Sequence, residues 1–218
     1  MIIDVEVTEY RHGITTDQIG LSRDTHSQKR LRSTYAPGWF SSPSRWLWRA
    51  DLAASPGFQH KVDKFAEVTA VEPWQDIIEY FARKAVAGGV QPPTGALHYP
   101  GRYPILNTGA MAAATEGLAG WFCEDRYHWH LIERPPRVTP DFVFAERGTG
   151  RYATVEVKSS GRLADPKSKL ETDMIKVLRM LAPTKLLRPS VHYYAGLIMI
   201  QVAHATSVRL TSLVLEET

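Results

Sequence analysis

Two carboxylates and one amine stand close together in the second half of the chain, at a spacing that could support chemistry. Asp141 follows Pro140, and a single residue separates Glu156 from Lys158. Two carboxylates side by side are unfavourable because each raises the pKa of the other, and a bound cation removes that cost. Carboxylate oxygens suit Mg²⁺ or Mn²⁺ better than zinc. The three residues therefore predict a divalent-metal site able to hold a cation beside a phosphodiester.

Two predicted strands joined by a short turn would position these residues. The run 152–158 is rich in β-branched and aromatic residues, and a side-chain period of two places Glu156 and Lys158 on one face. Asp141 lies at the start of a second apolar run, 140–146, and a glycine-bearing segment of hairpin length separates the two runs. A hairpin of this kind would bring Asp141 beside Glu156.

A third carboxylate is expected from a helix upstream of the two strands. The segment 108–125 contains alanine runs after a potential Asn or Thr cap, which predicts a helix. Small residues at spacings of three and four form a narrow stripe on this helix, and Glu116 falls on the same stripe. The stripe would let the helix pack closely against a sheet and would bring Glu116 near Asp141.

These residues resemble the motifs of the PD-(D/E)XK nuclease superfamily, the fold of many restriction endonucleases. Pro140 and Asp141 match the PD element, the segment 156–158 matches the (D/E)XK element, and Glu116 matches the acidic residue often found on the preceding helix. The resemblance implies a restriction-endonuclease-like α/β core, in which a mixed sheet is flanked by helices. The predicted elements follow the order of that core: helix 108–125, strands 127–133, 140–146 and 152–158, helix 167–182, and strand 193–202.

The resemblance also implies an activity. The chain is expected to be a metal-dependent nuclease, specifically a DNA endonuclease, whose products end in a 5′-phosphate and a 3′-hydroxyl. The implied catalytic residues are Asp141, Glu156, Lys158 and Glu116. Mg²⁺, or Mn²⁺ in its place, would be bound by Asp141, Glu156, Glu116 and the backbone carbonyl of Val157. Nothing in the sequence distinguishes DNA from RNA as substrate. Cutting both strands of a duplex calls for two such sites, which predicts a homodimer or a partner protein.

Two other interpretations of the same residues remain open. In the first, Asp141 caps a strand, Glu156 and Lys158 form an ion pair on an exposed sheet surface, and Glu116 is solvated. In the second, the same fold serves as a non-catalytic nucleic-acid-binding or assembly subunit, because a fold does not by itself determine a function. The intact set of two acids and a lysine favours the enzyme.

Basic residues gather in two segments of a chain whose formal net charge is only +3. Between residues 21 and 50, six basic residues oppose one acid and alternate with three tryptophans, and between 162 and 188 seven oppose three. Basic side chains neutralise phosphates and aromatic rings stack on bases. The predicted nucleic-acid-binding residues are Arg30, Arg32, Arg45, Lys167, Lys169 and Lys176. Alternatively, the tryptophans pack this segment onto the core and the charges are simply solvated.

The length of 218 residues and a hydrophobic content of 44% predict one α/β core with an extension. We expect the nuclease-like core at 107–218 and an α-rich N-terminal extension at 1–106, which carries the basic and aromatic arm. Within the extension, residues 33–56 are rich in Ser, Pro and Gly and predict a loop, whereas residues 74–86 follow a proline and precede two glycines, which predicts a helix.

Cysteine content and hydropathy limit the cross-links and metal sites that the chain can contain, and they indicate where in the cell to expect it. A single cysteine, Cys123, excludes an intrachain disulfide, a zinc ribbon and a cysteine-ligated iron–sulfur cluster. The first residues alternate like a strand and lack the pattern of a signal peptide, and the chain has no apolar run long enough to span a membrane. We therefore expect a cytoplasmic protein.

Overall fold

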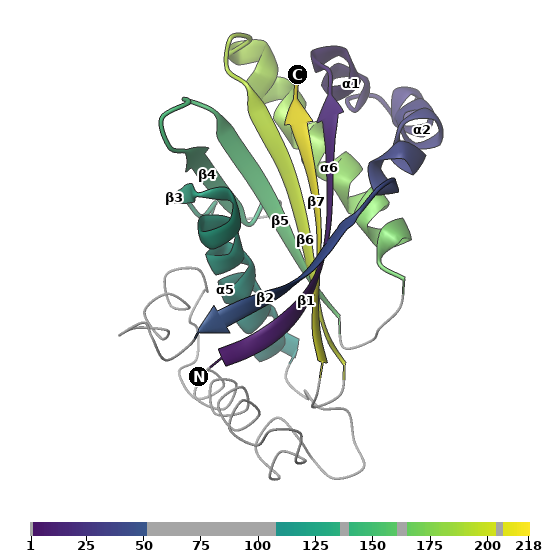
Figure 1. The fold of residues 1–218 in the computed structure, drawn as a ribbon. Coiled ribbons are helices and arrows are strands. Elements are labelled where there is room, and N and C mark those ends of the chain that lie inside the picture. Colours follow the sequence, from purple (N-terminus) through teal and green to yellow (C-terminus); the bar gives the residue numbers. More distant parts are fainter. Residues whose placement is uncertain (1, 52–107, 136–139, 161–164, 204–206) are drawn as a thin grey trace.

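One mixed sheet with helices on both faces organises the computed structural model, which describes residues 2–51, 108–135, 140–160, 165–203 and 207–218 (Figure 1). The strands of the described residues are β1 (Ile2–Ile14), β2 (Ser44–Asp51), β3 (Trp129–Glu133), β4 (Phe142–Glu146), β5 (Tyr152–Ser160), β6 (Tyr193–Ala203) and β7 (Ser207–Glu217). The helices are α1 (Thr16–Leu21), α2 (Thr25–Thr34), α5 (Thr108–Tyr127) and α6 (Lys167–Leu187), with a 3₁₀ helix η1 (Ala36–Phe40). The strand order is β2-β1-β7-β6-β5-β4-β3.

The predicted order of elements in the second half of the chain is confirmed. Strands β3, β4 and β5 form an antiparallel meander, and β5 then connects through α6 to β6, which pairs with it in parallel. The hairpin between β4 and β5 turns through Gly148 and Gly150, whose φ values are 80° and 71°. Glycine adopts such positive angles without steric cost. The glycines of this segment therefore fit the turn that the sequence predicts.

The prediction of an α-rich N-terminal extension is wrong for the described part of that section. Strand β1 pairs in parallel with β7 and antiparallel with β2, so both N-terminal strands belong to the main sheet. The section predicted as a loop contains η1 and β2 instead. Trp46 and Trp48 share one face of β2 and pack on the aromatic core, which favours a strand there despite the nearby Ser and Pro residues. The predicted helix 74–86 and the domain boundary at 106/107 lie outside the described residues.

Each face of the sheet has a separate hydrophobic core. On one face, here called the α5 face, Phe122 of α5 packs with Phe144 and Val155. On the opposite face, the α6 face, Leu178 of α6 packs with Leu197 of β6, and α1 and α2 cover the same side (Figure 1). Burying a side chain of this size contributes about 1.5–3 kcal/mol. The two cores hold α5 and α6 on opposite sides of strand β5.

The tryptophans of the basic segment pack into these cores. The Trp48 ring lies edge-on to those of Trp121 and Phe122, with centroids 5.2 Å and 5.3 Å apart. Trp39 is buried in the core of the α6 face, and Trp46 stacks on Phe122 at 6.0 Å. The packing interpretation of these residues is therefore confirmed.

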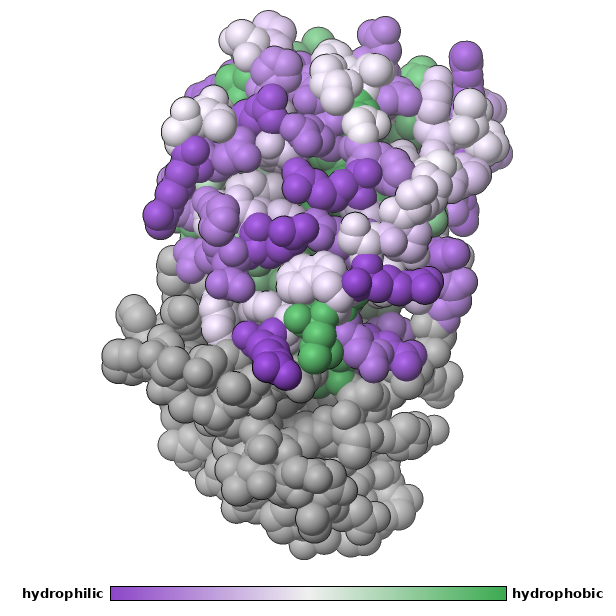
Figure 2. All heavy atoms as spheres, viewed as in Figure 1, coloured by the Kyte–Doolittle hydropathy of each residue, from purple (hydrophilic) through white to green (hydrophobic). Residues whose placement is uncertain are grey.

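The face visible in Figure 2 is largely hydrophilic, with apolar residues scattered among polar ones. Single exposed apolar side chains are ordinary on a folded protein. Leu186 and Leu187, at the C-terminal end of α6, are the most exposed large apolar residues of the described chain. No helix in the described ranges is both long and apolar enough to cross a membrane.

A buried ion pair fastens the C-terminal strand to the α6 face. Lys185 Nζ of α6 lies 2.7 Å from Glu217 Oε1 of β7, and the two side chains are only 7% and 1% exposed. The backbone N–H of Tyr193 and the hydroxyl of Thr16 also donate to Glu217, at 3.1 Å and 2.7 Å. Lys185 donates in turn to the carbonyl of Val191 at 2.8 Å. The pair therefore joins α1, α6, β6 and β7.

Breaking this pair from one side should be strongly destabilising. We expect Lys185→Met to lower the free energy of unfolding by about 3–5 kcal/mol, because Glu217 would remain charged and buried. Urea-induced unfolding measures the change, and the double variant Lys185→Met/Glu217→Leu should recover part of the loss. Arg32→Met, which removes a more exposed ion pair with Glu171, is the control and should cost less than about 1 kcal/mol. Equal losses in the two single variants would contradict a special role for the buried pair.

Candidate active site

Asp141 is held against the neighbouring strand. It directly precedes β4, and its Oδ2 accepts a hydrogen bond from the backbone N–H of Val157 at 2.6 Å. The register of the hairpin places Phe142 opposite Val155, so Asp141 falls next to Glu156. The expectation that a hairpin brings Asp141 beside Glu156 is confirmed.

Glu156 and Lys158 share the α6 face of β5. Val155 and Val157 belong to the core of the α5 face, so the residues alternating with them face α6. Lys158 forms an ion pair with Glu156, and the Glu156 side chain is only 5% exposed. The ion pair of the first alternative is therefore present, but the exposed surface that it assumed is not.

At both Asp141 and Lys158, burial and the neighbouring charges shift the pKa in opposite directions. Burial raises the pKa of Asp141, although the Val157 N–H and the charges of Lys158 and Arg134 partly oppose the rise. For Lys158, burial lowers the pKa, but its bond to Glu156 and the charges of Glu156, Asp141 and Asp173 outweigh that effect and raise it. Lys158 is thus a stable cation shared among several acids. A carboxylate that is costly to charge is one that a bound cation would stabilise.

Arg134 is a site residue that the sequence analysis missed. It follows β3, and its guanidinium lies 2.8 Å from Glu116 Oε2 and 5.3 Å from the centre of the Phe142 ring. Its charge also lowers the pKa of Asp141. Arg134 thus interacts with both acids, and the approach of Glu116 to Asp141 stays a prediction. No motif marks this arginine, but β3 pairs antiparallel with β4, so a residue after β3 must lie near the start of β4.

The residues with the donors to hold a metal ion are Asp141, Glu156 and the backbone carbonyl of Val157. Mg²⁺ is commonly bound by one or two carboxylates, with water completing its shell, so this donor set fits it. Within the described ranges, no group of three or more His, Cys, Asp or Glu side chains is arranged to hold a metal. Glu116, the predicted third carboxylate, is held by Arg134. A cation here would therefore depend on two side chains and one carbonyl.

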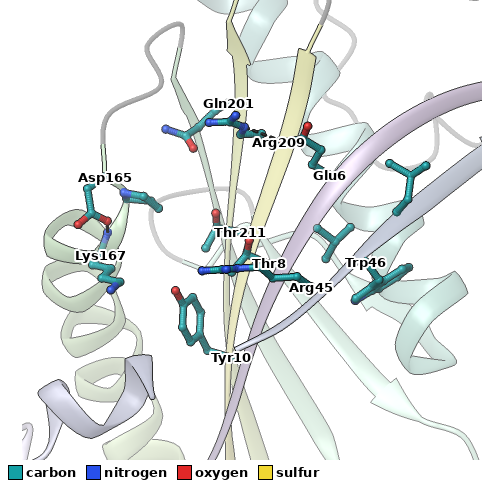
Figure 3. Close-up of a pocket in the computed structure, with 13 residues that line it drawn as sticks. Glu6, Thr8, Tyr10, Arg45, Trp46, Asp165, Lys167, Gln201, Arg209 and Thr211 are labelled. Atoms are coloured by element: carbon teal, nitrogen blue, oxygen red, sulfur yellow. Dashed lines mark hydrogen bonds and ion pairs between the residues drawn. The ribbon is translucent and has the colours of Figure 1, made fainter. Parts of the chain in front are cut away.

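Two of the predicted nucleic-acid-binding residues meet on the α6 face. Arg45 of β2 and Lys167 at the start of α6 line one hollow of about 810 Å³ (Figure 3). We call it the polar hollow, and define it by Thr8, Arg45, Lys167, Gln201, Arg209 and Thr211. Arg209, Gln201 and the two threonines were not predicted, because no motif marks them and the pairing of β1 with β7 that completes the hollow joins opposite ends of the chain.

The other four predicted nucleic-acid-binding residues lie outside this hollow. Arg32 of α2 forms an ion pair with Glu171 of α6. Lys176 pairs with the buried Asp173 one turn earlier on α6, with 2.6 Å between Nζ and Oδ1. Arg30 and Lys169 are exposed on α2 and α6. The predicted basic residues are thus divided among separate environments.

No family model, no curated protein and no solved structure matches the chain. The case for a function therefore depends on the site itself. Its features are a half-buried aspartate fixed to the adjacent strand, a buried glutamate, a shared lysine and a nearby arginine.

Neutralising Asp141 should not destabilise the protein. Its raised pKa means that the folded state binds this proton more tightly than the unfolded chain, so its contribution to stability falls as pH rises above 3.8 through the folded pKa. At pH 7 the carboxylate is charged at a cost, and Asp141→Asn should unfold at the same urea concentration as the wild type or a higher one. The amide oxygen can still accept the Val157 N–H. The difference should vanish well below pH 3.8, where Asp141 is protonated in both the folded and the unfolded chain.

The matched control for this measurement is Asp17→Asn. Asp17 is an exposed acid in the first turn of α1, where negative charge is favourable, so its loss should give no gain in stability. A marked destabilisation by Asp141→Asn at pH 7 would show that the charged carboxylate stabilises the fold, contrary to the raised pKa.

Proposed function

We propose that the chain is a metal-dependent phosphodiesterase and, more specifically, a PD-(D/E)XK nuclease that cleaves DNA. The observation that carries the proposal is the bond from the Val157 N–H to Asp141, which places Asp141 beside the buried Glu156 and its partner Lys158. These are the residues of the PD and (D/E)XK elements. Their meeting at one point needs two strands to pair in the correct register.

The order of the elements supports a restriction-endonuclease-like core. A helix, three antiparallel strands, a second helix and a strand parallel to the third follow one another from α5 to β6. This is the order that the resemblance implies. Helices α5 and α6 pack on opposite faces, as expected for a sheet flanked by helices.

Each residue of the site has a role in the proposed reaction. Asp141, Glu156 and the Val157 carbonyl would hold Mg²⁺, or Mn²⁺ in its place, which when bound supplies polarisation of the phosphate and lowers the pKa of a nearby water. Lys158 carries its positive charge at neutral pH, so it can orient the attacking water and offset the charge that develops on the phosphate. The water oxygen bonds to phosphorus and gives up a proton to solvent as the bond to the 3′ oxygen breaks. The 3′ oxygen takes a proton from solvent, leaving a 3′-hydroxyl and a 5′-phosphate.

Cleavage of supercoiled plasmid tests the proposed nuclease activity directly. The purified protein should nick or linearise supercoiled plasmid in Mg²⁺ or Mn²⁺ but not in EDTA, and Glu156→Ala/Lys158→Ala should lose at least about a hundredfold in rate, as removal of one transition-state stabilising group typically does. A linear product formed without a nicked intermediate would indicate paired sites, as in a homodimer.

The control for this assay is Lys29→Ala/Glu133→Ala, which makes the same charge changes at exposed positions of α2 and β3. It should cleave as fast as the wild type. The absence of metal-dependent cleavage on plasmid, single-stranded DNA and RNA would refute the catalytic proposal. Cleavage that survives in the site variant would point to a contaminating nuclease.

A non-catalytic nucleic-acid-binding or assembly subunit is the second candidate. It is favoured by the ion pairs that Lys158 and Arg134 make with Glu156 and Glu116, since they offset two of the three carboxylates without a metal. In this case an Asp141→Ala variant should bind DNA in EDTA with unchanged salt dependence, and no cleavage should occur with any metal.

Removing Arg134 should strengthen metal binding. Its positive charge acts on Asp141 and would repel a cation held there, so Arg134→Gln is expected to tighten Mn²⁺ binding roughly tenfold, or about 1.4 kcal/mol. Isothermal titration calorimetry with Mn²⁺ alone measures this. Arg147→Gln, in the turn at the opposite end of β4, removes the same charge at a distance and should leave the affinity unchanged. Weaker binding in Arg134→Gln would place the cation elsewhere.

A further inference from the structure

The polar hollow lies on the same face of the sheet as the candidate active site. Val208 and Leu210 belong to the core of the α5 face, so Arg209 and Thr211, which alternate with them on β7, face α6. The same alternation on β5 directs Lys158 to the α6 face. The hollow and the candidate site therefore lie on one face of the sheet.

The strand register connects the two sites. Lys158 pairs with Met199, Met199 with Thr211, Thr211 with Thr8 and Thr8 with Arg45, in one row across five strands. A second row runs from Ser160 through Gln201 and Arg209 to Glu6. Neighbouring strands are about 4.8 Å apart, so Thr211 lies roughly 10 Å from Lys158 across the sheet. The hollow thus begins on β6, the strand next to that of the candidate lysine, where Gln201 pairs with Ser160.

The side chains that define the hollow are of types that contact phosphate and sugar in nucleic-acid complexes. Figure 3 shows Arg45 reaching from β2 across β1 into the hollow, and Arg45 forms no ion pair with a described residue. Arg209 is paired with Glu6 at 2.8 Å, but the two side chains are 47% and 61% exposed, and such a pair is easily exchanged for another anion. Thr8, Thr211 and Gln201 add polar groups of the kind that contact phosphate and sugar.

The acids near the hollow do not cancel its positive charge. The lining contains three cations, Arg45, Lys167 and Arg209, against two acids, Glu6 and Asp165. Glu6 is paired with Arg209, whereas Lys167 and Arg45 come from opposite sides of the hollow. An anionic chain that passes between them would contact both.

We propose that the polar hollow binds the backbone of a single DNA strand that extends from the candidate active site. The volume of about 810 Å³ is in the range of sites for small ligands and is too small to enclose a duplex. The inference rests on the proposed function, because the strand is taken to continue from the cleavage site. Its ligand contacts, however, come from β1, β2, β6, β7 and the start of α6, which contribute none of the candidate catalytic residues.

Binding in EDTA tests the hollow apart from catalysis. Fluorescence anisotropy would follow a labelled single strand of about 12 nucleotides, and a duplex of the same sequence, over a range of salt concentrations. Arg45→Gln/Arg209→Gln should weaken single-strand binding at least about tenfold. Two lost phosphate contacts should also make the slope of log K against log salt less steep by about 1.4. Both arginines are exposed, and thermal unfolding would verify that the variant folds.

The matched control is Arg179→Gln/Arg188→Gln, which removes two exposed arginines from the later part of α6 and its C-terminal cap. It should keep the wild-type slope. An equal loss in both pairs, unchanged binding in Arg45→Gln/Arg209→Gln, no binding by the wild type, or a loss confined to the duplex would each overturn the inference.

The two proposals can fail separately. Glu156→Ala/Lys158→Ala should retain single-strand binding in EDTA, because its changes lie outside the hollow. If plasmid cleavage is absent but Arg45→Gln/Arg209→Gln loses binding and salt dependence as described, the hollow binds a single strand and the nuclease proposal is refuted. If cleavage occurs but this variant binds normally, the nuclease proposal is supported and the strand follows another surface.

Discussion

The parallel pairing of β5 with β6 is the constraint on which the rest of the structure depends. Parallel neighbours require a crossover, and α6 makes it over one face of the sheet. That crossing buries the face of β5 that carries Glu156 and Lys158 and brings Asp173 close enough to act on the lysine. The first turn of α6 also forms one wall of the polar hollow. The antiparallel partner β4 supplies Asp141 from the other side.

The charges at the centre of the molecule are arranged at a cost to stability. Glu156 is buried, and burial makes the ionised form of Asp141 unfavourable. Lys158 and Arg134 offset part of this cost by charge, and the Val157 N–H adds a hydrogen bond. The buried pair of Lys185 and Glu217 differs, because each of its charges is engaged by its partner and by further hydrogen bonds. Ionising the acids of this site remains unfavourable in the protein alone, and a bound cation or substrate could offset that cost.

The N-terminal strands widen the sheet and create the surface beyond the candidate site. Strand β1 lies beside β7, and β2 adds an outer strand that is anchored through Trp46 and Trp48 to α5. With the tryptophans directed to the α5 face, Arg45 falls on the α6 face. The basic and aromatic residues of this segment therefore have separate roles: the aromatic residues attach the segment to the core, and Arg45 lines the hollow.

Local patterns in the sequence were sufficient for the elements from α5 to β6 and for the meeting of Asp141 with Glu156. A period of two, a helix-forming run and a glycine turn each depend on residues close together in the chain. The placement of β1 beside β7, the bridge from Arg134 to Glu116 and the hollow shared by Arg45, Lys167 and Arg209 were decided only by the tertiary structure. The first and the last of these features join segments far apart in sequence, and the bridge depends on how α5 packs against the strands rather than on a motif. The sequence by itself determined which residues could do chemistry, and the packing decided which of them share a face, because a side chain's neighbours across a sheet are set by strand order rather than by sequence distance.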